Sequence, residues 1–443
     1  MKTCMIAAPA SGSGKTTITM GLLRALKQRG LDVCGYKTGP DYIDRAFLEA
    51  AAGKPAGNLD VHLQGETGLR YALAQARSEY CVVEGVMGYF DGISNTWQGS
   101  SYDIARRLDI PTVLIYTPGA EMFSIIPKLK GMAEFEQSTI QAVLFNNVTP
   151  RYYELIKTAV EDYTDLAVLG FVPKMDDVVL PSRHLGLVQQ SEIDDLDRKI
   201  TQVADTLEQC VDISAILEMM RPVGIRNCAT VFDDISSYDI TVAVAKDTAF
   251  SFYYRENLEL LERACRKVVY FSPMRDRELP PCDLLYLGGG YPEVFDKELG
   301  CNTSMLKSIR AHADNGGCVY AECGGFMYLT ESVDDVPMVG LFQGRTRLTS
   351  KLQRFGYIDI ELQADCLLGA AGDRLTAHEF HKSVSGVEGQ PLYKITKSLG
   401  TTTWECGYRY KNVLAGYPHI NFLGNLKAFK TLLSTVSSYR NKE

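Results

Sequence analysis

The first part of the chain alternates short apolar runs with segments of helical periodicity. Between the first two runs, apolar residues recur at helical spacing from Ile18 to Leu26, and Gly30 marks a stop. The runs that we interpret as buried strands are Cys4–Ala8, Val33–Tyr36, Cys81–Glu84, Thr112–Tyr116, Ala142–Phe145 and Ala167–Phe171. This alternation predicts a parallel sheet covered by helices.

A second alternation follows a helical, charged stretch at 188–220 and an irregular stretch at 221–238. Its apolar runs are Ile240–Val244, Val268–Phe271, Asp283–Leu287 and Cys318–Ala321, and short strands and turns predominate beyond Gly340. We therefore predict two α/β domains, at 1–187 and 239–437, joined by a helical segment and linker at 188–238.

The composition of the chain indicates which kinds of partner the protein can have. The 443 residues are 46% hydrophobic and 23% charged, as in globular proteins, and the net charge of −8 argues against a nucleic-acid partner. No apolar run is long enough to span a membrane, and the first residues lead straight into a strand without a cleavage site. We expect a cytoplasmic protein with a small-molecule partner. The twelve cysteines are scattered, so we expect most to be buried apolar side chains.

A glycine-rich stretch between the first strand and the first helix matches a phosphate-binding loop. Lys15 would neutralise phosphate charge and Thr16 would bind Mg²⁺, while the helix N-terminus favours anions. One departure is Pro9, which stands where the first glycine of the usual pattern lies. The residues that we expect to bind ATP are Gly12, Ser13, Gly14, Lys15, Thr16 and Thr17.

Acidic residues follow neighbouring predicted strands. Glu84 ends one strand and Asp91 lies in the loop after it, while Asp41 and Asp44 follow the strand at Val33–Tyr36. Carboxyl ends of parallel strands meet at one edge of a sheet, where open α/β folds bind ligands. Carboxylate oxygens suit Mg²⁺, so the pattern predicts a shared site, although a single loop carboxylate is often only solvated.

Cys323 lies two residues after the predicted strand at Cys318–Ala321 and is followed directly by two glycines. Cys323, Gly324 and Gly325 followed by a helical segment resemble a nucleophile elbow, in which a sharp turn exposes a thiol at a helix N-terminus. The glycine-rich stretch 288–290 is a second source of backbone N–H donors for an oxyanion.

A thiol nucleophile needs a base, and the chain holds six histidines. His419 follows a strand-like run near the end of the second domain, and His378 and His381 are competitors whose spacing could also suit a metal. Spacing alone does not choose among them.

Taken together, these motifs resemble the cobyrinate a,c-diamide synthase family over essentially the whole chain. The resemblance is carried by the stretches 8–17, 37–44, 84–88 with 91–92, 180–187, 288–293, 321–329 and 378–381. It implies a dethiobiotin-synthetase-like P-loop domain followed by a class I, triad-type glutamine amidotransferase domain. The expected reaction is amidation of the a- and c-carboxylates of a corrin, cobyrinate, with ammonia from glutamine and with ATP as co-substrate, through acyl phosphates, in cobalamin biosynthesis.

The resemblance also implies roles for individual residues. Cys323 and His419 would be catalytic, and the N–H groups around Gly290 and Gly324 would bind the oxyanion. Mg²⁺ would be bound by Thr16, Glu84 and Asp44. The residues implied to bind substrate are Asp41, Tyr42, Asp44, Asp91, Arg183 and His184. Asn421 stands where class I enzymes usually have a glutamate, so Cys323 and His419 would work as a dyad or with another carboxylate.

Four alternatives stay open at this point. The same chemistry on hydrogenobyrinate or Ni-sirohydrochlorin fits the sequence as well, and cobyrate synthase shares both domain types. A switch ATPase of the ParA/MinD kind is a rival from another class, which the presence of Cys323 and its glycines disfavours. A binding module with an inactive glutaminase domain is disfavoured because Cys323 and His419 are both present. A second copy of the chain, in a homodimer, is a candidate partner.

Overall fold

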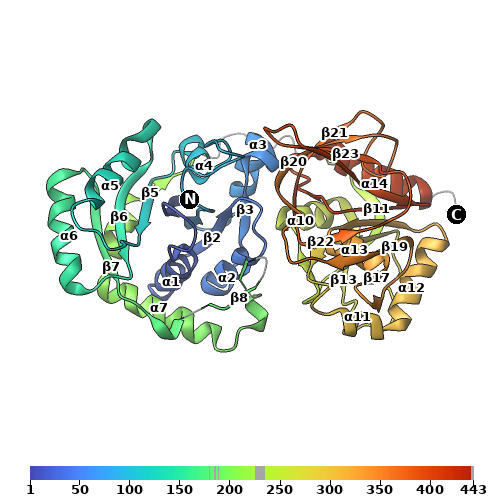
Figure 1. Cartoon of the computed structure of the whole chain (residues 1–443), viewed down its shortest axis with the longest axis horizontal. Coiled ribbons are helices and arrows are strands. Elements are labelled where there is room, and N and C mark those ends of the chain that lie inside the picture. The colour runs from blue at the N-terminus through green and yellow to red at the C-terminus, as the bar shows by residue number, and fades with distance from the viewer. Residues whose placement is uncertain (179, 184–185, 188, 225–234, 441–443) are drawn as a thin grey trace. The chain divides into compact units, whose positions relative to one another are not determined.

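The computed structural model describes residues 1–178, 180–183, 186–187, 189–224 and 235–440. The chain divides into two compact units, one made of Met1–Val61 and Leu69–Cys228 and the other of His62–Gly68 and Ala229–Glu443. Both are α/β, as predicted (Figure 1). The proposed domain limits at 187 and 239 stay a prediction.

The first unit is built on one sheet whose neighbouring strands are parallel, apart from an antiparallel β10 (Arg221–Pro222) beside β1. In spatial order its strands are β3 (Gly57–Leu59), β2 (Val33–Thr38), β4 (Tyr80–Glu84), β1 (Lys2–Ala7), β5 (Thr112–Tyr116), β6 (Ile140–Asn146) and β7 (Ala167–Val172). The six runs interpreted as strands all appear here. Most of their residues are buried on both faces, except on the edge strand β7, which explains the unbroken apolar composition.

Helices connect these strands. They are α1 (Lys15–Gln28), α2 (Ile43–Ala52), α3 (Val61–Ala74), α4 (Ser101–Leu108), α5 (Ile125–Glu134), α6 (Pro150–Tyr163), α7 (Leu196–Cys210) and α8 (Ile213–Met219), with 3-10 turns η1 (Phe135–Gln137), η2 (Asp176–Val178) and η3 (Gln190–Glu192). Helices α1, α2 and α7 pack together, and Arg24 on α1 bonds Asp197 on α7 at 2.7 Å. The two-residue strands β8 (Ser182–Arg183) and β9 (Gly186–Leu187) pair with each other.

The central sheet of the second unit is parallel except at one edge. In spatial order it runs β13 (Cys265–Phe271), β11 (Tyr238–Ala245), β14 (Leu284–Leu287), β16 (Cys318–Glu322), β26 (Val413–Gly416) and β25 (Tyr408–Tyr410), with β25 antiparallel. The surrounding helices are α10 (Arg255–Ala264), α11 (Asp296–Cys301), α12 (Thr303–Asp314), α13 (Gly324–Leu329) and α14 (Leu426–Arg440).

Smaller sheets complete this unit. An antiparallel one orders β24 (Thr403–Cys406), β23 (Tyr393–Lys397), β20 (Arg354–Leu362), β21 (Arg374–His381) and β27 (His419–Ile420). Another orders β18 (Val336–Pro337), β17 (Thr330–Val333), β19 (Phe342–Leu348) and β22 (Ser383–Ser385), and β12 (Phe250–Phe252) pairs with β15 (Gly289–Gly290). The expectation of short strands beyond Gly340 is thus confirmed.

Seven residues of the N-terminal sequence belong to the second unit. In the segment His62–Gly68, the His62 ring meets Tyr357 edge-on, and its Nε2 lies 3.2 Å from Oγ of Ser398. Helix α3 is interrupted here, because Gly65 has φ 65° and ψ 172°. A left-handed backbone of this kind favours glycine.

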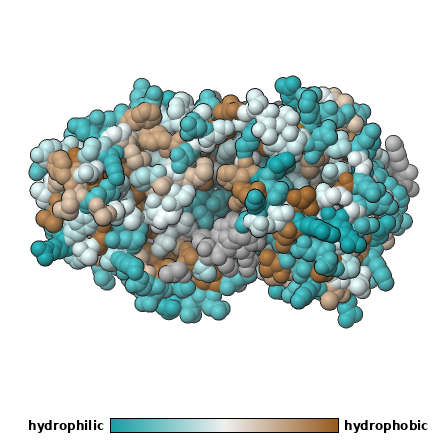
Figure 2. All heavy atoms as spheres, viewed as in Figure 1, coloured by the Kyte–Doolittle hydropathy of each residue, from teal (hydrophilic) through white to brown (hydrophobic). Residues whose placement is uncertain are grey.

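On the face shown in Figure 2, hydrophobic residues occur in scattered groups among hydrophilic ones. Within the described residues, no helix combines the length and the apolar composition that crossing a bilayer requires.

Candidate active sites

The glycine-rich loop connects β1 to α1, the context that a phosphate-binding loop requires. Gly14 immediately precedes α1 with φ 84°, and a Cβ there would lie 2.6 Å from Nδ2 of Asn146. That same Nδ2 donates to the carbonyl of Ser13 at 3.1 Å. Asn146, at the end of β6, therefore holds the loop, and a side chain at position 14 would have to displace it.

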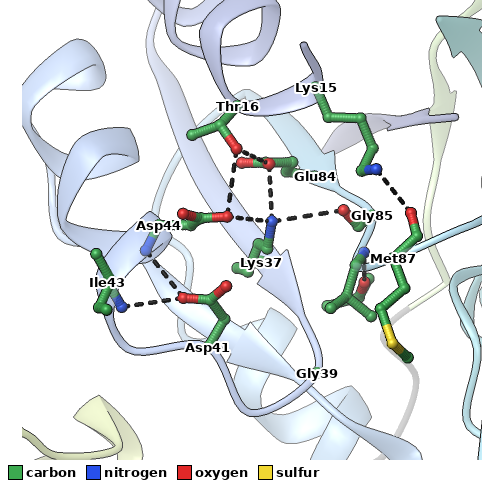
Figure 3. A network of polar contacts seen from close by, with 12 residues as sticks. Lys15, Thr16, Lys37, Gly39, Asp41, Ile43, Asp44, Glu84, Gly85 and Met87 are labelled. Carbon is green, nitrogen blue, oxygen red and sulfur yellow. Dashed lines mark hydrogen bonds and ion pairs between the residues drawn. The ribbon is translucent and has the colours of Figure 1, made fainter. Parts of the chain in front are cut away.

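Lys15 extends from the start of α1 back across this loop (Figure 3). Its Nζ donates to the carbonyls of Ala10 at 3.0 Å and Met87 at 2.6 Å. Burial, and then the positive charge of Lys37, lower the pKa of Lys15 to about 8. The two carbonyls hold the ammonium where a phosphate bound to the loop would replace them as its partner.

Thr16, Asp44 and Glu84 come together at the carboxyl edge of the sheet, as predicted for neighbouring parallel strands (Figure 3). Oγ1 of Thr16 donates to Oε1 of Glu84 at 2.6 Å and lies 3.2 Å from Oδ2 of Asp44. Lys37, on β2, places Nζ 2.7 Å from both carboxylates. The two carboxylates thus bind both the hydroxyl of Thr16 and the ammonium of Lys37.

The electrostatics of this cluster follow from burial and charge. Burial acts to lower the pKa of Lys37, but Asp44 and Glu84 together hold it above its usual range. Burial of Asp44 acts to raise its pKa, but the neighbouring charge of Lys37 outweighs this effect and lowers the pKa of Asp44. Oε2 of Glu84 is buried, and no described residue bonds it. A hydroxyl and two carboxylates, one with an oxygen to spare, are the donor set that a magnesium nucleotide uses.

The remaining acidic residues border the same cluster. Oδ1 of Asp41 accepts the N–H groups of Ile43 at 3.0 Å and Asp44 at 2.9 Å, so it caps the first turn of α2. Burial and then Asp44 raise the pKa of Asp41 to about 7. Tyr42 directly precedes α2. Asp91 accepts the N–H of Gly88 at 2.9 Å, and its charge acts on Lys15.

Arg183 and His184 are the last two residues expected to bind substrate, and the structure describes only the first of them. Arg183 ends β8, and its backbone pairs with Gly186. His184 lies outside the described residues.

In the second unit, Cys323 lies between β16 and α13 in the sharp turn expected of a nucleophile elbow. Its φ of 46° and ψ of −103° are unusual for a residue with a side chain, and strain of this kind concentrates at functional sites. Its N–H donates to the carbonyl of Gly416 at 2.8 Å, while that of Gly325 donates to Gly288 at 2.9 Å. Burial, and then Glu293 and Glu379, raise the pKa of the Cys323 thiol well above its usual range.

The 288–290 loop packs directly against the elbow. A Cβ at Gly324 would lie 3.0 Å from the backbone N of Gly290 and 2.9 Å from Cδ of Pro292. A Cβ at Gly290 would overlap the carbonyl of Ala249. The two residues expected to bind an oxyanion are therefore neighbours in space, and each lies where a side chain would collide.

His419 lies at the same place. A Cβ at Gly289 would overlap Cε1 of the His419 ring, so this histidine also packs on the 288–290 loop. Burial, and then His381, lower the pKa of His419 to about 3, which keeps the ring neutral. Glu322, directly before Cys323, places Oε2 4.0 Å from Nδ1 of His419. Thus His419 and the turn that carries Cys323 meet at one loop.

The competing histidines have other surroundings. His378 is the strand partner of His419 between β21 and β27. His381 stacks on Tyr417 with ring centroids 3.7 Å apart, and its Nδ1 lies 2.8 Å from the carbonyl of Ser383. In the parts of the chain that the structure describes, no three His, Cys, Asp or Glu side chains form a metal-binding group.

Comparison with known proteins also divides the chain into two parts. Residues 4–188 match the model of the CobQ/CobB/MinD/ParA nucleotide binding domain, and residues 241–426 match that of the CobB/CobQ-like glutamine amidotransferase domain. Cobyrinate a,c-diamide synthase from Clostridium tetani is 41% identical over 98% of this chain and 100% of its own length.

The chain belongs to the cobyrinate a,c-diamide synthase family. Its relative from Clostridium acetobutylicum is also 41% identical, over 98% of this chain and 100% of its own. One from Limosilactobacillus reuteri is 36% identical over 99% of both. The family resemblance and the fold class expected from the sequence are thereby confirmed. Like the rest of its family, the protein is an ATP- and glutamine-dependent ligase that forms amides.

Sequence reasoning missed several residues of these sites. Lys37 lies in the stretch 37–44, but the sequence alone assigns it no role, and Asn146 directly follows the predicted strand Ala142–Phe145. Glu322 is not expected from the family pattern, in which the acid stands two residues after the histidine. The available signals were a second lysine near the end of the strand that precedes Asp41 and Asp44, and a carboxylate one residue before Cys323.

Proposed function

We propose that this protein amidates the a- and c-carboxylates of cobyrinate with ammonia taken from glutamine, at the expense of ATP, in cobalamin biosynthesis. The observation that carries the proposal is the presence in one chain of two sites: the strained elbow of Cys323 against the 288–290 loop, and the Lys15, Thr16 and Glu84 cluster after a phosphate loop. The names of the relatives supply the substrate.

In the glutaminase step, Sγ of Cys323 bonds to the amide carbon of glutamine, and its proton passes to His419. The N–H groups of Gly290 and Gly324 bind the oxyanion that forms. The C–N bond then breaks as His419 returns the proton to nitrogen, and ammonia leaves. Water hydrolyses the thioester, releasing glutamate and restoring the thiol. The neutral ring of His419 supports its role as the base.

In the synthetase step, a carboxylate oxygen of the corrin takes the γ-phosphoryl group of ATP, giving ADP and an acyl phosphate. Ammonia bonds to the acyl carbon, and the C–O bond to phosphate breaks. Phosphorylation is needed because a carboxylate is a poor acyl donor. The loop residues Gly12, Ser13, Gly14, Lys15, Thr16 and Thr17 would bind the phosphates, with Lys15 opposing their charge.

Mg²⁺ fits the cluster of Thr16, Glu84 and Asp44, because these side chains offer oxygen donors within reach of one another. When bound, the ion would neutralise phosphate charge. Lys37 lies between the same carboxylates, and we propose that it opposes the charge of the transferred phosphoryl group. Asp41, Tyr42, Asp44, Asp91, Arg183 and His184 are proposed to bind the corrin.

The decisive experiment follows the corrin by mass spectrometry, with purified protein, ATP, Mg²⁺ and cobyrinate, and either glutamine or an ammonium salt as nitrogen source. We expect two successive replacements of a carboxyl by an amide group. Cys323→Ala should abolish the reaction with glutamine and retain it with ammonium, whereas Glu84→Gln should abolish both. Cys301→Ala, which removes an exposed thiol, is the matched control and should change neither.

An unchanged corrin with ATP hydrolysis intact would contradict cobyrinate as the substrate. Hydrogenobyrinate and Ni-sirohydrochlorin are then the next substrates, tested in the same assay. Failure of all three, together with ATP-dependent dimerisation, would favour the switch ATPase instead. The proposal further places the enzyme in the cytoplasm, without a nucleic-acid partner and with a second copy of the chain as a candidate partner. Gel filtration tests the oligomeric state.

A further inference from the structure

The residue two positions after the catalytic histidine is not an acid, and its side chain is already hydrogen-bonded to the backbone. Asn421 stands there, and its Oδ1 accepts the N–H of Leu423 at 3.0 Å. This bond turns the chain after β27 toward α14. A neutral amide held by its own backbone cannot supply a negative charge to His419. If the base has an acidic partner, it must come from another element.

Glu322 is the carboxylate that reaches His419. It ends β16, directly before Cys323, and it is only 2% exposed. Its Oε2 lies 4.0 Å from Nδ1 of His419. Oε1 accepts the N–H of Ile420, the residue after His419, at 3.0 Å. The same side chain is therefore tied to β27 and faces the ring that β27 carries.

Two hydroxyl donors complete the surroundings of Glu322. Tyr320 donates to Oε1 at 2.7 Å, and Tyr286 donates to Oε2 at 3.0 Å. A buried carboxylate is costly unless hydrogen bonds satisfy it, and here both oxygens are bonded. The site is thus constructed to hold a carboxylate in one orientation beside the histidine.

We propose that Glu322 is the positioning acid of the glutaminase centre, which holds Nδ1–H of His419 so that Nε2 is free to take the proton of Cys323. In triads of this logic the acid fixes the tautomer of the histidine and stabilises the imidazolium, without itself taking the proton. The proposal rests on the roles assigned above to Cys323 and His419. The distance of 4.0 Å exceeds a hydrogen bond, and contacts of catalytic groups commonly tighten when substrate binds.

The proton states of the pair support this role. Burial raises the pKa of Glu322 to about 7, so the acid becomes charged near neutrality. Burial lowers the pKa of His419 to about 3, so its ring accepts a proton only when a negative charge lies beside it. Ionised Glu322 provides that negative charge beside Nδ1, and the thiolate of Cys323 provides it beside Nε2.

Glu379 is the rival carboxylate in this unit. It is 1% exposed, and its Oε2 lies 3.8 Å from Nε2 of His381. It therefore faces a different histidine, whose ring is stacked on Tyr417. Glu379→Gln is the matched variant for Glu322→Gln, because each replaces one buried carboxylate beside one histidine with an amide of the same shape.

Glu322→Gln is a sharp test, because a carbonyl oxygen can still accept the bonds from Tyr320 and Ile420. The amide nitrogen then faces Nδ1 as a donor, which favours the tautomer that carries its proton on Nε2. We expect kcat/KM for glutamine to fall by about 100-fold or more, because the wrong histidine tautomer costs about 10⁴-fold in a serine-protease triad. Amidation driven by ammonium should stay at the wild-type rate.

The pH profile separates this role from a structural one. With full-length protein, glutamine hydrolysis measured from about pH 5.5 to 9 should rise through about pH 7 in the wild type and lack that rise in Glu322→Gln. The groups that face Glu322 are Tyr253, Tyr286, Tyr320, Tyr393, Cys323 and His419. Burial raises the pKa of the tyrosines and the thiol and lowers that of His419, so the rise belongs to Glu322.

A third test measures the tautomer of His419 in the wild-type protein, so it does not depend on a variant that is active. The ¹⁵N shifts of the side-chain nitrogens of His419, identified by comparison with His419→Gln, should show Nδ1–H in the wild type. A proton on Nε2 in the wild type would overturn the proposal, even if Glu322→Gln failed to fold. So would a wild-type pH profile in Glu322→Gln, or the loss of the rise in Glu379→Gln alone. Retention of glutamine-driven activity by Cys323→Ala would instead contradict the glutaminase assignment itself.

Discussion

The ammonium of Lys37 lies 2.7 Å from Oε1 of Glu84, and the two side chains are almost fully buried (Figure 3). A second carboxylate, that of Asp44, lies equally close to the same Nζ. One lysine thus balances two acidic groups at the edge where the phosphate loop begins. Removal of that lysine leaves negative charge without a counter-ion in the site proposed to receive the phosphates of ATP.

We predict that Lys37→Met lowers the free energy of unfolding of the first unit by about 3 to 5 kcal/mol, the usual result of breaking a buried ion pair. It should also abolish amidation with either nitrogen source. Each unit contains one of the two tryptophans, so Trp97 reports this unit when Trp404 is replaced by phenylalanine. Denaturant unfolding followed by its fluorescence measures the effect.

Lys54→Met is the matched control for this variant. Lys54 pairs with Asp32, and both side chains are about two-fifths exposed. Exposed pairs contribute at most about 1 kcal/mol, so this change should be small. Equal stability of Lys37→Met and the wild type would show that the buried cluster is not held together by Lys37.

A second prediction concerns the close approach of Gly289 to His419. Gly289→Ala places a methyl group on Cε1 of the ring and must displace it, so we expect glutamine hydrolysis to fall by about tenfold or more. Ammonium-driven amidation should be retained, because the first unit is unchanged. Gly386→Ala, where no atom lies within 4 Å of the new Cβ, is the control in the same unit. Full glutaminase activity in Gly289→Ala would exclude this position of His419 during catalysis.

A third prediction concerns the resting thiol. Cys323 is 6% exposed, burial raises its pKa well above the usual range, and the neighbouring His419 is neutral. Since only the thiolate reacts readily, iodoacetamide at about pH 7 should modify the exposed Cys301 before Cys323. Peptide mass spectrometry at successive times measures the order. Prior modification of Cys323 would mean that a thiolate already exists without substrate.

The parts of these sites that could be predicted are those that backbone topology determines. Thr16, Asp44 and Glu84 follow different strands of one parallel sheet, and the carboxyl ends of such strands meet. The turn at Cys323 followed from its glycines. Strand β3, with three residues, was missed because it is too short to show a period.

The other parts depend on side-chain directions and on contacts between distant segments. The positions of these residues along the sequence do not indicate that Nζ of Lys37 lies between two carboxylates. Nor do they indicate that the side chain of Glu322 contacts β27. That the ring of His419 lies against the loop beside Cys323 follows only from its packing on Gly289. Likewise, His62–Gly68 joins the second unit through contacts with residues such as Tyr357 and Ser398, which lie about 300 positions later.

The pKa of Glu322 leads to a final prediction, on stability. Its value of about 7 lies above the unfolded value of 4.5, so its contribution to stability is complete below pH 4.5 and is lost as pH rises through 7. Glutamine at this position does not titrate. Between about pH 5 and about pH 8, Glu322→Gln should therefore gain about 2 to 3 kcal/mol relative to the wild type. Trp404 fluorescence in a Trp97→Phe background reports unfolding of the second unit, and Glu361→Gln, at an exposed ion pair, should show no such gain. A difference that is constant with pH would mean that Glu322 keeps its ordinary pKa in the folded protein.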